Sequence, residues 1–338
     1  MTAEFTSFAG NKRTIASDTA RTASFNEIPI ISLKSPNAEL IAQLRDACTR
    51  VGFFYIQDHD VPQEKIDKTF EIAKSFFAQE KEVKNEINYK KSRILRGYEP
   101  PAEVRTDETK KADLNEAFNW GYEKALDPER RDSDDEETGQ NAWPTHPSFK
   151  STLSDYYTSL LTLARHLLRL FAQVLDLQPT YFDPLVTHPG AMARLIHYPP
   201  QSPNDPTALG IGAHTDIECF TILCQGAVPA LQILNAEGEW IQAPPVPGTF
   251  VVNIGDMLAR WTNDRFISTV HRVWNVTGEE RYSIPFFFGV NYDVVIETLE
   301  GCLGKGEEGR YAPVVAGDYV YGRLSASRLP VKGKAVQV

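Results

Sequence analysis

The run of short apolar segments that begins near Ala191 constrains the fold of this chain more than any other feature. From there to about residue 290, these segments alternate with turns rich in proline and glycine, such as Pro199-Pro200, Pro244-Pro245 and Pro247-Gly248. Several short strands at regular spacing are typical of a β-barrel or a jelly roll. We therefore predict a mostly β core in the second half of the chain.

The first half is predicted to be richer in helix. Apolar residues recur at helical spacing after Ser35-Pro36, again from Ile66 to Phe77, and along a predicted helix from about Pro147 to Leu175. We expect these helices to pack outside the barrel within one domain of 25–325. The expected parts are a flexible tail over 1–24, a helix-rich part over 25–185, a jelly-roll core over 186–295, a C-terminal cover over 296–325 and a tail over 326–338.

Two histidines and one aspartate in the strand-rich half are candidate metal ligands. His214 and Asp216 are two residues apart, so on a regular strand both side chains would leave the same face. His271 can join them from a distant strand that lies opposite in a barrel. Two imidazoles and one carboxylate form the facial triad that binds Fe(II) and leaves positions open for other ligands. Taken singly, a turn residue at Asp216 and a core histidine at His271 remain alternatives.

A candidate anchor for an organic acid follows the second histidine. Residues 270–276 and 281–289 have the composition of two strands of a hairpin, joined by a turn at 277–280. Alternation places Arg281, Ser283, Pro285 and Phe287 on one face. The planar guanidinium of arginine suits a carboxylate, so metal ligands and anchor are expected to face one cavity. The candidate residues for its substrate-facing wall are Phe287, Tyr98, Phe118 and Leu223.

The remaining histidines and one further carboxylate have simpler interpretations. His197 would point away from the cavity if Tyr198 faces it. Glu218 would share the face of Asp216 on a regular strand, but a solvated or turn carboxylate is the simpler interpretation. We expect a structural role for His166, and the sequence gives His59, His146 and His188 no paired ligand.

Composition limits the partners and the compartment. A net charge of −10 and a pI of about 5.3 argue against nucleic acid or an anionic membrane as the main partner. The four cysteines lack the spacing of a disulfide framework or a zinc site, which predicts free thiols. No apolar run approaches the roughly 20 residues needed to span a bilayer. We expect a cytoplasmic monomer or weak homo-oligomer; Lys12, Arg13 and Arg21 keep a transit peptide as the alternative to a simple tail.

At these residues the chain resembles the isopenicillin-N-synthase-like branch of the Fe(II)/2-oxoglutarate dioxygenases. The likeness includes Thr221 to Gln225 after the first ligand pair, and Val252 to Asp256 before the second histidine. It also includes Ile28 to Ile31 and Val51 to Ile56, so that it extends from about Ile28 to about Val290. Two positions depart from the family pattern: Ile196 stands where an asparagine is frequent, and Ala230 where glycine is usual.

The resemblance implies an α+β chain with a double-stranded β-helix (jelly-roll, cupin-like) barrel and flanking helices. It implies His214, Asp216 and His271 as ligands of Fe(II), and O2 and 2-oxoglutarate as cosubstrates. Arg281 and Ser283 would hold the distal carboxylate of 2-oxoglutarate, with help from Tyr198. Oxidative decarboxylation to succinate and CO2 would then produce a ferryl centre that abstracts hydrogen from a small organic substrate. Hydroxylation, desaturation, ring formation and ring expansion are all open outcomes, in a setting of secondary-metabolite biosynthesis.

Three other functions are weighed against this one. An oxidase of the same fold would use O2 without 2-oxoglutarate, and its arginine and serine would hold the substrate's own carboxylate. A non-catalytic module that binds a small acid would not depend on iron. A zinc hydrolase would leave Arg281 and Ser283 without a role.

Overall fold

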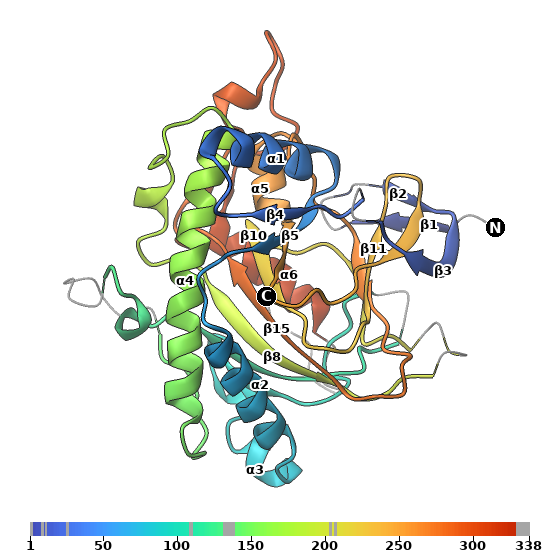
Figure 1. Cartoon of the computed structure of the whole chain (residues 1–338). Coiled ribbons are helices and arrows are strands. Elements are labelled where there is room, and N and C mark those ends of the chain that lie inside the picture. The colour runs from blue at the N-terminus through green and yellow to red at the C-terminus, as the bar shows by residue number, and fades with distance from the viewer. Residues whose placement is uncertain are drawn as a thin grey trace.

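Two β-sheets face one another and helices cover the outside of the larger sheet (Figure 1). The computed structural model describes residues 3–7, 10, 12–24, 27–107, 111–130, 139–202, 205 and 208–328. The larger sheet has eight strands in the order β4 (Ile30–Ser32), β5 (Phe53–Gln57), β13 (Phe250–Ile254), β10 (Phe220–Cys224), β15 (Arg281–Phe288), β8 (Met192–Tyr198), β7 (Glu116–Gly121) and β6 (Gly97–Glu99).

The smaller sheet has five strands and carries both histidines of the candidate metal site. Its order is β3 (Ser17–Thr22), β12 (Glu239–Gln242), β11 (Leu231–Leu234), β14 (His271–Val273) and β9 (Ile211–His214). Two further pairs of strands stand apart from these sheets: β1 (Ala3–Thr6) with β2 (Lys12–Ile15), and β16 (Val295–Ile296) with β17 (Val314–Val315).

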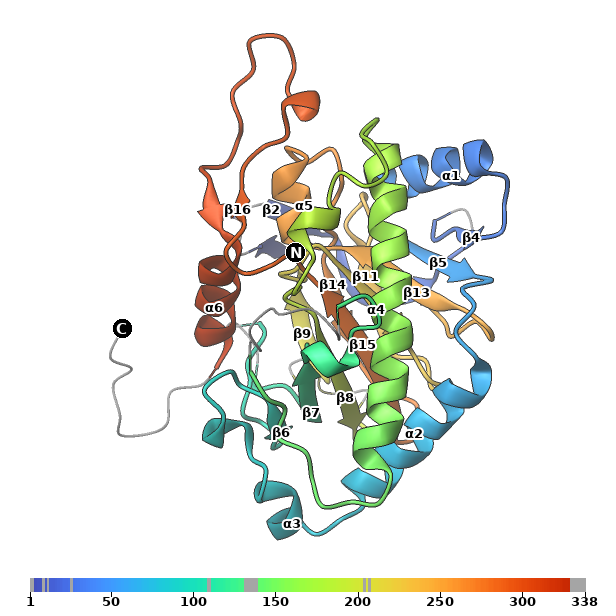
Figure 2. The same ribbon diagram turned by 90° about the vertical axis from the view of Figure 1, so that its left-hand side faces the viewer.

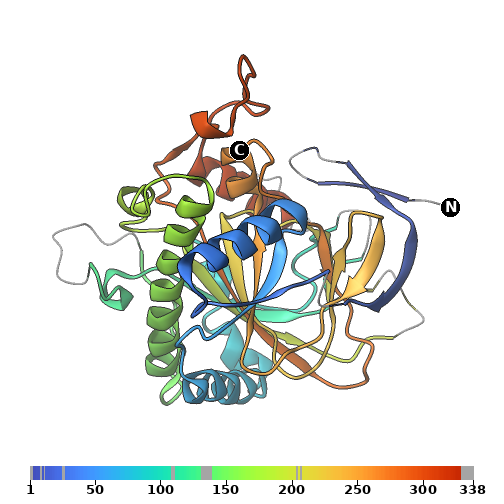
Figure 3. The same cartoon turned by 45° about the horizontal axis from the view of Figure 1, so that its top comes forward.

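The helices gather mainly on one side of the eight-stranded sheet. Figure 2 shows α4 on one side of the strands and α6 on the other, and Figure 3 shows α1 crossing near one end of α4. The α-helices are α1 (Asn37–Arg50), α2 (Gln63–Phe77), α3 (Lys81–Asn85), α4 (Phe149–Val174), α5 (Asp256–Trp261) and α6 (Ala316–Ser327). Short 3-10 helices lie at η1 (Tyr89–Lys91), η2 (Lys124–Leu126), η3 (Asp183–Leu185) and η4 (Glu300–Cys302).

The main hydrophobic core lies between the helices and the outer face of the eight-stranded sheet. The apolar stripe of α4 is buried there: Tyr157 meets Phe286 of β15 edge to face, and Phe171 meets Phe220 of β10 in the same way. Such aromatic pairs add about 0.5–1.5 kcal/mol each beyond burial of their area. The opposite face of this sheet is thereby left to line the space between the two sheets.

One glycine fixes the connection from α1 into the sheet. Gly52 has a φ of 72°, and a Cβ at this position would lie 2.0 Å from the carbonyl oxygen of Ile267. Only glycine combines this left-handed backbone with so close an approach. The chain can therefore leave α1 and enter β5 within a few residues.

The flexible tail predicted over 1–24 differs from the structure. Residues Ser17–Thr22 form β3, which pairs in parallel with β12 at the edge of the five-stranded sheet. Arg272 of β14 donates to the carbonyl oxygen of Asp18 at 2.6 Å. The polar composition suggested a tail, but an edge strand exposes one side to water and tolerates such residues. In the other predicted tail, 326–338, α6 continues to Ser327, and residues 329–338 lie outside the described part.

Candidate metal centre and the cavity around it

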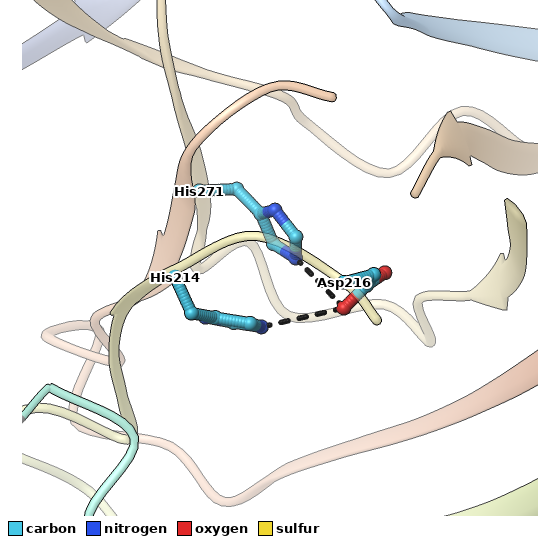
Figure 4. A group of neighbouring side chains, drawn as sticks. All are labelled: His214, Asp216 and His271. Carbon is cyan, nitrogen blue, oxygen red and sulfur yellow. Dashed lines mark ion pairs between the residues drawn. The ribbon is translucent and has the colours of Figure 1, made fainter. Parts of the chain in front are cut away.

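His214, Asp216 and His271 meet at one point between the sheets (Figure 4). The Nε2 atoms of His214 and His271 lie 3.5 and 3.7 Å from Oδ1 of Asp216. One ligand atom from each residue lies within 4.8 Å of the others. Among the residues that the structure describes, this is the one group of three or more histidine, cysteine or acidic side chains so arranged.

The route by which the three residues meet differs from the prediction in two ways. His214 and His271 are direct partners on the paired strands β9 and β14, rather than residues from opposite sides of a barrel. In addition, β14 and β15 do not form a hairpin: β15 pairs with β10 and β8 in the other sheet. The chain crosses between the sheets at 274–280, a connection that the strand pattern alone does not distinguish from a hairpin turn.

The regular strand predicted over 213–220 is also interrupted. Strand β9 ends at His214 and β10 begins at Phe220, so Asp216 lies in the turn between them. The backbone carbonyl oxygen of Asp216 accepts a hydrogen bond from the amide of Asp256 at the start of α5, and that of Ile217 accepts one from Met257. Contact with α5 fixes the turn and directs the Asp216 carboxylate toward the histidines.

Hydrogen bonds leave the correct atoms of both imidazoles available for a metal. Nδ1 of His214 lies 2.9 Å from the carbonyl oxygen of Gly212, and Nδ1 of His271 lies 3.1 Å from that of Thr269. A carbonyl oxygen only accepts, so each Nδ1 carries a proton, and in the neutral ring each Nε2 keeps a free lone pair. Partners of this kind commonly set the tautomer of metal-binding histidines.

Asp216 is oriented in a similar way by two neighbours in the eight-stranded sheet. Its Oδ2 accepts hydrogen bonds from Thr221 Oγ1 at 2.5 Å and from Asn253 Nδ2 at 2.7 Å. These bonds occupy one carboxylate oxygen and leave Oδ1, the atom that faces both histidines. Sequence reasoning gave neither residue this role, although an asparagine within the apolar strand Phe250–Ile254 was a usable signal.

Electrostatics favour an ionised carboxylate between imidazoles that differ in basicity. Burial acts to raise the pKa of Asp216, but the adjacent imidazoles and the Asn253 amide hold it far below its ordinary value. Burial lowers the pKa of His271 to about 4, and His214 adds to that effect. Burial also opposes charge on His214, but the interaction with Asp216 raises its pKa overall. The site therefore combines an anionic carboxylate with two imidazoles, of which His271 is the one kept neutral by burial.

Arg281 is the second strong feature of the space between the sheets. Its side chain is only 1% exposed, and its guanidinium lies 4.7 Å from the centre of the Tyr198 ring. It donates to the carbonyl oxygen of Val228 and to Ser283 Oγ, both at 3.3 Å, and Ser283 lies 3.4 Å from the Tyr198 hydroxyl. Among the described residues, no carboxylate forms an ion pair with it. A buried guanidinium without a carboxylate partner is suited to binding an anionic ligand.

These residues line one cavity of about 760 Å³ that extends from Arg281 past the histidines to α6. The volume lies within the range of small-molecule sites. Arg281, Ser283, Pro285 and Phe287 all line it, so the predicted alternation along β15 is confirmed. Leu223 also lies on its wall.

Tyr98 and Phe118 lie elsewhere, and their prediction as cavity walls is wrong. They are direct partners on β6 and β7, so they share a face of the sheet, and that face is turned toward the helices. Both rings contact Phe76 of α2 edge to face. The residues next to Phe118 on β7 point to the other face. The sequence alone did not determine which of the two alternating sets of residues on this strand faces the cavity.

The other candidate residues fall on both sides of the sheet. His197 points away from the cavity, as predicted from Tyr198, and its Nδ1 lies 2.9 Å from a carboxylate oxygen of Glu116. Glu218 lies in the turn after Asp216, but it is buried on the cavity wall rather than solvated. His188 also lines the cavity, whereas His146 contacts Ser75 near the surface. The four cysteines are free and buried, as predicted.

Comparison with known proteins identifies two family regions. Residues 28–146 match the N-terminal region described as "non-haem dioxygenase in morphine synthesis", and residues 189–290 match the 2OG-Fe(II) oxygenase superfamily. The "2-oxoglutarate-Fe(II) type oxidoreductase ppzC" of Metarhizium rileyi is 39% identical, over 92% of this chain and 90% of that protein. The protein of the same type named hxnY, from Emericella nidulans, is 38% identical over 88% and 89%.

Solved structures of the same type share the architecture. A full-length Neurospora crassa protein, crystallised in complex with alpha-KG, superposes with a TM-score of 0.78 at 29% identity, over 88% of this chain and 96% of that one. A 2OG-Fe(II) oxygenase family protein from Caulobacter crescentus gives 0.76 at 35% identity, over 88% and 98%. The α+β architecture with a double-stranded β-helix core, expected from the sequence, is that of these neighbours.

Proposed function

The chain belongs to the 2OG-Fe(II) oxygenase superfamily, and from that premise we propose that His214, Asp216 and His271 bind its iron. The protein is an oxidoreductase that depends on Fe(II) and 2-oxoglutarate. Two neutral imidazole nitrogens and one carboxylate oxygen make up a donor set that suits ferrous iron. The convergence of these three atoms is the observation that carries the proposal.

The proposal also gives each residue around Arg281 a part in holding the cosubstrate. Arg281 and Ser283 bind the distal carboxylate of 2-oxoglutarate, and Tyr198 supports the guanidinium and adds a hydroxyl. The absence of a carboxylate partner for Arg281 among the described residues supports this, because a bound acid would supply the missing negative charge. Burial lowers the pKa of Arg281, but a guanidinium stays protonated in proteins.

Iron with bound 2-oxoglutarate supplies the activation of O2, with conversion of 2-oxoglutarate to succinate and CO2 and oxidation of the substrate. The protein's own contribution is to position the reactants and to exclude water. Thr221 and Asn253 hold Asp216 in one orientation. Apolar side chains such as Leu223, Leu231 and Phe287 line the cavity near the proposed ligands and keep that part of it dry.

The substrate in this proposal is a small organic molecule, and the setting is secondary-metabolite biosynthesis. The volume of the cavity and the sequence similarity to fungal oxidoreductases support it. A cytoplasmic monomer or weak homo-oligomer is part of the proposal, since reduced thiols and ferrous iron suit a reducing compartment. Among the described helices, none is both long and apolar enough to cross a membrane.

The test is succinate formation from 2-oxoglutarate under air, with and without Fe(II). Wild-type protein is expected to form succinate only when Fe(II) is supplied, even without its organic substrate, at a slow uncoupled rate. His214→Ala and His271→Ala should abolish that rate, whereas His166→Ala, an exposed histidine of α4, should keep it. Full activity in either ligand variant would refute the assignment of the iron ligands.

A further inference from the structure

The outer part of the cavity is lined by an unusual number of arginines. Away from Arg281, the guanidinium groups along its wall belong to Arg93, Arg96, Arg105, Arg194, Arg323 and Arg328. The acidic side chains along the same part of the wall are Glu99, Asp113, Glu218 and Asp293. A positive excess in the cavity of a chain with net charge −10 requires a local explanation.

Glu99 and Asp113 are already engaged and do not neutralise the whole set. Glu99 is shared by two arginines, since its carboxylate lies 2.5 Å from Arg194 and 3.5 Å from Arg328. Asp113 accepts hydrogen bonds from Thr106 and from the backbone amide of Gly212 at 3.0 Å. Within the described residues, neither carboxylate forms an ion pair with Arg96 or Arg105.

Arg105 is a cation of this set whose side chain has no hydrogen bond or ion pair within the described residues. Its backbone amide bonds to Ser327 at the end of α6, which fixes the position of the segment. Its side chain lines the cavity, its Nε is buried, and within the described residues that nitrogen has no hydrogen-bond partner. A buried donor left unsatisfied carries a desolvation cost. A ligand that supplies an acceptor would remove that cost.

Arg96 has a similar setting on the same wall. Its NH1 donates to the backbone carbonyl oxygens of Tyr122 and Gly139 at 3.1 and 3.4 Å, and no carboxylate forms an ion pair with it in the described part of the chain. Burial lowers its pKa, as expected for a cation removed from water without a counter-ion. Backbone carbonyls orient this guanidinium but do not neutralise it.

We propose that the outer part of the cavity is a binding subsite for a carboxylate of the organic substrate, held by Arg105, with Arg96 adding positive charge along the same wall. This inference rests on the proposed function, because it names the substrate class for the same cavity. The substrate is then an organic acid whose carboxylate binds near α6 while the carbon to be oxidised lies near the three metal-binding residues. Arg194 and Arg328, which share Glu99, add to the positive field.

The experiment uses two fluorescent probes that differ only in charge: dansylglycine, a carboxylate, and dansylglycinamide, which is neutral. Each is titrated into anaerobic protein loaded with Fe(II) and saturating 2-oxoglutarate, so that Arg281 is occupied. We expect the wild type to bind dansylglycine about tenfold more tightly or better. Arg105→Gln should remove most of that preference and Arg96→Gln part of it. Arg50→Gln, a change in an exposed ion pair of α1, should keep it.

The thermal midpoint separates binding from structure. Since the Arg105 side chain has no partner within the described residues, Arg105→Gln should leave the midpoint unchanged or raise it. Equal affinity for the two probes, no binding of the acid, or an unchanged preference in both Arg105→Gln and Arg96→Gln would overturn the inference. The visible absorbance of the Fe(II) and 2-oxoglutarate complex reports on the proposed function separately. If that band forms but the probe preference is absent, the inference alone fails; if wild type gives no band, the proposed function fails.

Discussion

The inner and outer parts of the cavity satisfy their polar groups in opposite ways. Around the proposed metal site, each imidazole has a carbonyl partner, and Asp216 has two donors on one oxygen. In the outer part, Arg105 has a buried nitrogen without a partner in the described part of the chain, and Arg96 is held by carbonyls alone. The inner part is organised before any ligand arrives, whereas the outer part has more arginines than acidic side chains.

The difference follows from the elements that build each part. The inner residues come from paired strands and from a turn fixed against α5, so their positions are set by the ladders of two sheets. The outer residues come largely from 93–106 and from α6 and its end, segments joined by few hydrogen bonds. Such segments vary at lower cost than sheet strands. We therefore expect the inner part of the cavity to carry the chemistry shared with relatives, and the outer part to determine which substrate binds.

The largest expected effect comes from the inner part. Asp216→Ala removes the one anionic ligand and should lower succinate formation by about a thousandfold or more, as loss of an essential group does. Initial rates under saturating Fe(II) and 2-oxoglutarate measure it, with His166→Ala as the control. Residual activity near wild type would mean that the inner part is not the reaction centre.

Arg281→Lys should have the next largest effect. Lysine keeps the charge but loses the planar pair of donors. Charge-assisted hydrogen bonds contribute about 1.5–3 kcal/mol, so we expect the KM for 2-oxoglutarate to rise by roughly 10- to 100-fold. The exposed Arg50→Lys is the matched control. An unchanged KM would mean that 2-oxoglutarate does not bind at Arg281. The distinction between the inner and outer parts of the cavity would then fail.

Asn253→Ala tests whether the inner part owes its affinity to pre-organisation. The change removes one of the two donors to Asp216 Oδ2. Loss of such an orienting partner typically costs about 10- to 100-fold in metal affinity. The Fe(II) concentration that gives half-maximal succinate formation should rise by that factor, while the KM for 2-oxoglutarate changes little. Equal effects on both constants would indicate a general loss of structure instead.

A charged cluster behind the same sheet should affect stability but not catalysis. Glu116, on the face turned toward the helices, is bonded to Lys84 at 2.7 Å, Tyr98 at 2.6 Å and His197 at 2.9 Å. Glu116→Gln leaves the buried Lys84 without its counter-ion and should lower the free energy of unfolding by about 1–3 kcal/mol, with an unchanged KM for 2-oxoglutarate. Urea unfolding measures it, with exposed Glu71→Gln as the control.

The stability difference between wild type and Glu116→Gln should also depend on pH in a direction that can be predicted. Burial acts to raise the pKa of Glu116, but its hydrogen bonds to His197, Lys84 and Tyr98 lower it overall. Its stabilisation is therefore fully present above the unfolded value of about 4.3 and is lost as the pH falls through the lower folded value. The difference in unfolding free energy between wild type and Glu116→Gln should shrink below about pH 4. A difference that grew there would contradict this interpretation.

The sequence was sufficient for the features that depend on local periodicity. The long helix expected over 147–175 is α4, and alternation along β15 correctly placed Arg281, Ser283 and Phe287 on one face. The spacing of His214 and Asp216 identified the residues that converge. It did not give the reason, because Asp216 is directed by a turn packed on α5 and not by a strand.

Features set by pairing between distant segments could not be predicted in this way. The face of β7 on which Phe118 lies depends on its register with β6 and β8, and one residue of slip would reverse it. Likewise, β14 and β15 belong to different sheets although their sequences suit a hairpin. The outer arginines are spread from residue 93 to 328, and only the fold brings them to one wall.

The most direct test of the account is an anaerobic titration with Fe(II) and then 2-oxoglutarate, followed by visible absorbance. Wild-type protein should develop a weak charge-transfer band with one equivalent each of iron and 2-oxoglutarate. Asp216→Ala should develop none, and Arg281→Lys should require far more 2-oxoglutarate. A band of wild-type intensity and affinity in Asp216→Ala would show that iron binds elsewhere and would contradict the central claim.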